Sequence, residues 1–107
     1  MTKTEFFERN GTFVGFSIRQ HTGAAPEGED IVCAAVSSAA YMTVNTITDV
    51  LLAKAHAEAD EDEAELRIMI LPESVELCRA VMEGFHLHIL ALEEQYPMNI
   101  QVIRTEV

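Results

Sequence analysis

Residues 20–38 read QHTGAAPEGEDIVCAAVSS, and the rest of the chain is organised around this stretch. A loop that begins with His21 leads into a helix, and Asp30 is a residue type that often caps the start of a helix. With Asp30 as the N-cap, Cys33 is the third helical residue and lies among unpaired backbone N–H groups. Those groups and the helix dipole favour an anion, so we expect the Cys33 thiolate to form more readily than that of a free cysteine. His21 could fold back across the loop and act as its base, which outlines a Cys-His pair.

Several residues here fall in an order and at a spacing that are typical of one protein family. They are His21, Gly23, Gly28, the run DIVCAAVS at residues 30–37 and, further along the helix, Asn45. In these residues the chain resembles the ribosomal-processing cysteine protease family. The resemblance implies one cysteine protease domain over residues 1–107, with His21 and Cys33 as the catalytic residues and with no cofactor. Gly23 and Gly28 belong to a loop, Thr22 to Glu29, that we expect to be mobile over the site.

One part of the pattern departs from the family. The family usually has Gly-His-Ala-Gly where this chain has Gln20-His21-Thr22-Gly23. A glutamine beside the histidine can restrict the loop or alter the substrate groove. It leaves both expected catalytic residues in place.

The resemblance also implies a substrate and a mechanism. Members of the family remove a short N-terminal extension, ending in aromatic residues, from large-subunit ribosomal protein twenty-seven. Cys33 would attack the scissile carbonyl, and His21 would protonate the departing amine. The alternative is a non-catalytic dimeric interaction module of ribosome assembly that keeps the helix only for packing. The reactivity of the thiol separates the two hypotheses.

Asp30 has two open roles. As an N-cap it would accept a hydrogen bond from the N–H of Val32 or Cys33, which is the commoner role of an aspartate before a helix. As a supporting catalytic residue it would orient His21.

Composition narrows the classes of partner. The chain has 7 Lys and Arg against 18 Asp and Glu, a formal charge of −11, which argues against direct nucleic-acid binding. Such a charge suits a basic protein substrate, although an acidic surface also serves solubility. Two cysteines and an N-terminus without an apolar leader predict a cytoplasmic protein. The uncharged run Ile31 to Thr48 carries enough polar residues to predict a buried central helix, not a membrane span, and a homodimer that packs on it.

No metal site is predicted. The acidic run Asp60 to Glu63 lacks the spacing of a calcium loop and is more typical of a solvated turn. On a helix His86 and His88 would point in different directions, so they could not share one ion. Cys78 falls inside an apolar helical stripe and is expected to be a small core residue.

The pattern of the whole chain predicts a two-layer α/β (α+β) fold. Asn10-Gly11 joins strands at Thr4–Arg9 and Thr12–Arg19. A helix is expected from Asp30 to about Ala55. A second hairpin is expected next, and its second strand contains the apolar residues that recur at every second position over residues 66–70. A second helix is expected to begin at Pro72. Its stripe comprises Val75, Cys78, Met82, Phe85, Ile89, Leu92 and Tyr96, and residues 100–102 begin a closing strand. The order is ββαββαβ, with two helices on a mixed, largely antiparallel sheet.

Overall fold

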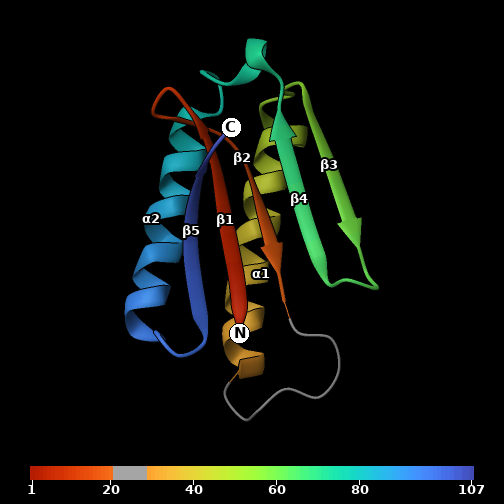
Figure 1. The fold of residues 1–107 in the computed structure, drawn as a ribbon. Coiled ribbons are helices and arrows are strands. Elements are labelled where there is room, and N and C mark those ends of the chain that lie inside the picture. The colour runs from red at the N-terminus through yellow and green to blue at the C-terminus, as the bar shows by residue number, and fades with distance from the viewer. Residues whose placement is uncertain (21–28) are drawn as a thin grey trace.

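The computed structural model describes residues 1–20 and 29–107, which form two α-helices and a five-stranded sheet (Figure 1). In chain order the elements are β1 (Thr2–Arg9), β2 (Thr12–Arg19), α1 (Glu29–Asn45), a π-helical turn (Thr46–Val50), β3 (Ala55–Asp60), β4 (Glu65–Ile70), a 3-10 turn (Pro72–Ser74), α2 (Arg79–Gln95) and β5 (Ile100–Glu106). The predicted order ββαββαβ is confirmed.

The sheet is mixed and largely antiparallel, as expected, with the strand order β3-β4-β2-β1-β5. β1 pairs with β2, β2 with β4 and β3 with β4, all antiparallel, whereas β5 lies parallel to β1 on its other side. The first hairpin turns at Asn10 and Gly11, whose φ angles are 54° and 79°. Positive φ at both residues is what a type I′ turn requires, so the predicted hairpin is confirmed.

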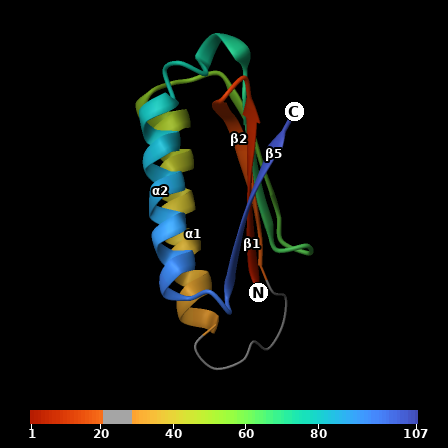
Figure 2. The ribbon, with the colours of Figure 1, turned by 60° about the vertical axis from the view of Figure 1, so that its left-hand side comes forward.

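Both helices cover one face of the sheet, which gives the molecule two layers (Figure 2). Side chains alternate between the faces of a strand, so the central strands direct every second residue into the core. Phe6 of β1, Phe16 and Ile18 of β2 and Ile68 of β4 are buried there. The register places Phe6 opposite Phe16, and Phe16 opposite Ile68.

α1 packs on this face through residues that are four apart. Val32, Val36, Ala40 and Val44 are all buried, as the helical repeat dictates for one contacting face. The segment Asp30–Val50 is long and apolar enough to cross a membrane by length and composition alone. Contrary to the expectation from the sequence, its polar residues therefore do not exclude a membrane span. The buried stripe instead supports the predicted helix packed against the sheet.

α1 differs from the prediction at both ends. It begins at Glu29, one residue before Asp30, and its π-helical continuation ends at Val50 rather than near Ala55. Leu52 has a φ of 52°, a left-handed backbone that cannot continue a right-handed helix. β3 begins at Ala55, where the helix was expected to end, and the backbone of β3 pairs with β4 along its whole length. The predicted second hairpin is confirmed.

The predicted amphipathic stripe is confirmed along α2, with Val75 and Cys78 just before the helix and Tyr96 just after it. Its members are buried in the core or packed against it: Val75, Cys78, Met82, Phe85, Ile89, Leu92 and Tyr96. The helix itself begins at Arg79 and not at Pro72, which is a correction to the predicted start. Pro72–Ser74 forms a separate 3-10 turn, and its Ser74 hydroxyl accepts the Lys54 N–H at 2.8 Å, which ties this turn to the segment before β3.

Candidate active site

Cys33 lies on α1 beside the stripe that holds this helix against the sheet. Val32 is fixed in the core, and successive helical residues are about 100° apart, so Cys33 is turned to one side of that contact. Its thiol is free and half-buried, and Thr2 Oγ1 lies 3.3 Å from its sulfur. Because Thr2 is fully buried, the sulfur is packed against the start of β1 and only partly accessible.

The start of α1 at Glu29 changes the expected place of Cys33 and of Asp30. Cys33 is the fifth residue of the helix, so the unpaired N–H groups of the helix start belong to the turn before it. Asp30 is the second helical residue and not the N-cap that was predicted. Its carboxylate is exposed and has no hydrogen-bond partner among the described residues. An acidic residue in this turn still interacts favourably with the helix dipole. A role for Asp30 in orienting His21 stays a prediction.

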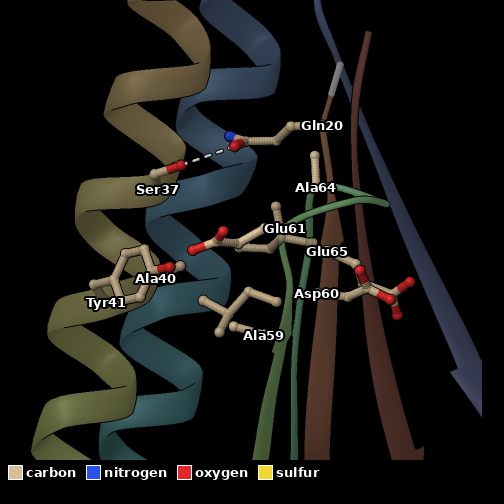
Figure 3. Close-up of a pocket in the computed structure, with 11 residues that line it drawn as sticks. Gln20, Ser37, Ala40, Tyr41, Ala59, Asp60, Glu61, Ala64 and Glu65 are labelled. Carbon is tan, nitrogen blue, oxygen red and sulfur yellow. Dashed lines mark hydrogen bonds between the residues drawn. The ribbon is translucent and has the colours of Figure 1, made fainter. Parts of the chain in front are cut away.

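Gln20 connects the end of β2 to the turn of α1 that carries Cys33. Its side-chain Nε2 donates to the Cys33 carbonyl at 2.8 Å, and the Ser37 hydroxyl donates to its Oε1 at 2.9 Å. Its backbone N–H donates to the Ala64 carbonyl at 3.0 Å, in the turn between β3 and β4. Figure 3 shows Gln20 between Ser37 and Ala64. Three separate elements therefore meet at this one residue.

A cavity of about 240 Å³ lies next to this junction, between α1 and the β3–β4 hairpin. Gln20 and Ser37 line one part of it, and Ala40 and Leu66 supply apolar surface. Glu61 points from the hairpin toward α1 (Figure 3). Three carboxylates, those of Asp60, Glu61 and Glu65, also belong to the lining, so the cavity is acidic on the side of the hairpin.

The other predicted site residues cannot be placed. His21, Gly23, Gly28 and the expected mobile loop from Thr22 to Glu29 fall on or overlap a segment that lies outside the described residues. The chain enters that segment from Gln20, which contacts the Cys33 carbonyl. The pairing of His21 with Cys33 therefore stays a prediction.

Cys78 and His86 lie in the core, and His88 lies on the surface. Cys78 is 1% exposed, and burial raises the pKa of its thiol, which agrees with its predicted place in the core. His86 is buried against Phe6 and Phe13, whereas His88 is exposed. Within the described part of the chain no group of histidine, cysteine and carboxylate side chains is arranged to hold a metal.

Sequence reasoning missed one residue of this site, Thr2. It lies 31 positions from Cys33, and nothing in the local pattern points from one to the other. The strand alternation carries a weak signal, since Thr2 lies on the same face of β1 as Phe6, the face that meets the helices. Gln20 was noticed only as a departure from a family pattern, and its contacts with α1 required the structure.

Comparisons with known proteins agree on one relationship. Residues 1–101 match a family model described as cysteine protease Prp. The protein SMU.848 from Streptococcus mutans is 25% identical, with a TM-score of 0.85 over 100% of this chain and 96% of that chain. An essential ribosomal processing protease Prp from S. aureus in complex with a substrate peptide is 18% identical, with a TM-score of 0.89 over 98% and 100% of the two chains. The same protease with a covalently linked product peptide is 19% identical, with a TM-score of 0.84 over the same shares. No curated protein gives a significant match.

Proposed function

Because the chain belongs to the cysteine protease Prp family, we propose that it is the endopeptidase that removes an N-terminal extension from large-subunit ribosomal protein twenty-seven. Cys33 is the nucleophile and His21 is the general base and acid. The observation that carries this assignment is the setting of Cys33: a free, half-buried thiol near the positive end of α1, with Thr2 Oγ1 3.3 Å from its sulfur. Cys78, which is buried away from solvent, does not compete for the role.

The proposed reaction is acyl transfer in two steps. His21 takes the proton of the Cys33 thiol, and the sulfur attacks the scissile carbonyl carbon to form a C–S bond. The C–N bond then breaks as His21 gives that proton to the departing amine, which leaves a thioester on Cys33. Water, deprotonated by His21, hydrolyses the thioester and releases the leader as a carboxylate. We assign the stabilisation of the oxyanion of each tetrahedral intermediate to N–H groups in the first turn of α1.

Two observations support a ribosomal protein as substrate. The S. aureus protease, described as a ribosomal processing enzyme, was crystallised with a substrate peptide and with a covalently linked product peptide, and this chain shares its fold over 98% of its length. The formal charge of −11 creates a negative field that attracts basic proteins. Ribosomal proteins carry the complementary charge.

Incubation with the leader-bearing ribosomal protein, read by intact mass, tests the proposal. We expect loss of the leader with the wild-type chain and no loss with Cys33→Ala. The competing hypothesis, a non-catalytic dimeric module of ribosome assembly, predicts an unchanged mass and a thiol that reacts with iodoacetamide no faster than a core cysteine. Trimming by the Cys33→Ala variant would show that the nucleophile is assigned wrongly.

We further propose that the chain works as a cytoplasmic homodimer. A groove of about 660 Å³ runs between α1 and α2 on the side away from the sheet, lined by small and apolar residues that include Ala35, Ala39, Met42, Val81 and Gly84. Met42, which lines this groove, is 66% exposed and so is available to a partner. Light scattering should give twice the chain mass for the wild type and a monomer for Met42→Glu.

A further inference from the structure

Gln20, at the end of β2, is bound to two other elements through three different groups. The backbone N–H is held by the Ala64 carbonyl in the β3–β4 turn, and the side-chain amide reaches α1 with both of its ends. The two α1 partners, the Cys33 carbonyl and the Ser37 hydroxyl, are four residues apart, so they lie one above the other on the same face of the helix. The side chain of Gln20 thus spans the turn of α1 from Cys33 to Ser37, and Figure 3 shows its bond to Ser37.

This arrangement fits a glutamine and few other side chains. A primary amide supplies a donor for the carbonyl and an acceptor for the hydroxyl at the same time. A glutamate keeps only the acceptor and would set a negative charge against the Cys33 carbonyl. An asparagine has the same groups on a shorter stem, and a glycine has neither. Both bonds are partly buried, so a lost partner is incompletely replaced by water.

The bonds restrict the motion that matters most for the sulfur of Cys33. The stripe of Val32 and Val36 holds α1 on the sheet but leaves a small rotation about the helix axis, because apolar contacts are not directional. The sulfur lies off this axis, against Thr2, so a rotation of the turn shifts it sideways. A displacement of about 1 Å of a reacting group can cost on the order of 100-fold in rate.

We propose that Gln20 is a positioning residue that fixes the turn of α1 carrying Cys33 and so sets the line of attack of its sulfur. The inference rests on the proposed function, since it assigns Gln20 to the geometry of that nucleophile. Gln20 acts on the sulfur through the backbone of the helix, which it reaches at the Cys33 carbonyl.

Steady-state cleavage of a leader peptide by Gln20→Ala, Gln20→Glu and Gln20→Asn tests the proposal, with Gln101→Ala as the matched control on the exposed side of β5. We expect kcat to fall by roughly 10- to 100-fold in all three variants while KM changes by no more than about 2-fold, because only the attacking atom is misplaced. Ser37→Ala should lower kcat less, and should add little in the Gln20→Ala background, because both changes break one network. Retention of the wild-type kcat in Gln20→Ala, or an equal loss in Gln101→Ala, would overturn the proposal.

Alkylation of Cys33 by iodoacetamide supplies a readout that needs no substrate. Release of the turn should expose the half-buried sulfur, so alkylation of Gln20→Ala should be roughly 3-fold faster or more although its turnover is lower. The melting temperature, measured in parallel, excludes global unfolding as the cause. A rate equal to that of the wild type would overturn the positioning role. If the wild type cleaves no leader peptide, the proposed function fails, and the alkylation rates still decide whether Gln20 holds the Cys33 turn.

Discussion

The hydroxyl of Thr2 lies 3.3 Å from the sulfur of Cys33, so the first strand reaches the proposed nucleophile directly. Thr2 is held from the other side as well, because its N–H donates to the Asn99 carbonyl at 2.8 Å and its backbone pairs with Ile100 of β5. The hydroxyl therefore has a fixed place at the edge of the β1–β5 pair. A thiolate can only accept hydrogen bonds, so this hydroxyl is the donor whenever Cys33 is ionised.

Replacing Thr2 with valine should lower turnover without harming the fold. Valine keeps the shape of threonine and loses the hydroxyl, so we expect roughly a 10-fold loss of kcat, the factor for about 1.4 kcal/mol of hydrogen bonding. Thr2→Ser should retain most activity. Thr4→Val is the matched control, because Thr4 is equally buried on the same face of β1 and its hydroxyl has no partner among the described residues. A similar loss in Thr4→Val would show that the effect comes from packing.

Substitution of Cys33 separates chemistry from folding. Cys33→Ala removes little volume from a half-buried helical position where alanine is well tolerated, so the melting temperature should change little while cleavage is abolished. Cys33→Ser should also be nearly inactive, because a hydroxyl is far less acidic than a thiol and His21 is not expected to ionise it. Single-turnover assays with the leader peptide measure both variants. Substantial cleavage by either would remove Cys33 from the mechanism.

The accuracy of the sequence predictions followed the range of the interactions that decide each feature. Asn10-Gly11 fixes its turn through its own backbone preferences, and the apolar stripe of α2 is visible in the spacing of its residues alone. The predicted end of α1 was wrong because β3, which begins at Ala55, has an unremarkable composition and forms through its pairing with β4. The order of strands, which brings β5 beside β1, depends on contacts across nearly the whole chain.

The candidate site divides in the same way. Cys33 could be named from a local pattern, because a helix start and a family motif surround it in sequence. The contacts that hold it could not, since Thr2 is 31 residues away and Gln20 is 13 residues away. Asp30, predicted as the N-cap, is the second helical residue, because helix starts depend on details that differ little between neighbouring polar residues.

Gly15 should tolerate no side chain. A Cβ built there would lie 2.3 Å from the Ile68 carbonyl oxygen and 2.8 Å from the Met69 sulfur, and the carbonyl belongs to the backbone of β4. We expect Gly15→Ala to lower the free energy of unfolding by roughly 1–3 kcal/mol in urea titrations, the usual range for an overpacked site. Gly84→Ala is the control, since nothing lies within 4 Å of its Cβ and alanine favours a helix. Equal stabilities for the two variants would contradict this account of Gly15.

His86 is a titratable group inside the core. Its ring contacts Phe6 edge-on and lies beside Phe13, with ring centroids 4.7 Å apart in both cases. Its Nε2 is buried and has no hydrogen-bond partner among the described residues. Burial lowers the pKa of His86 below its ordinary value, and the positive charge of Arg104 lowers it further, with a smaller opposing effect from Glu8.

The lowered pKa of His86 predicts that stability falls in mild acid. Between the folded pKa and the ordinary value of about 6.5 the unfolded chain binds more protons than the folded chain, so the free energy of unfolding rises with pH in that window. The contribution of His86 is therefore fully present above this value and is lost as the pH falls below it. Melting temperatures of the wild type and of His86→Leu, measured from about pH 7.5 down to about pH 5, should converge or cross, because only the wild type must protonate a buried ring. His88→Gln, a change on the exposed face of α2, should follow the wild type. Parallel curves for wild type and His86→Leu would show that His86 does not set the acid stability of this fold.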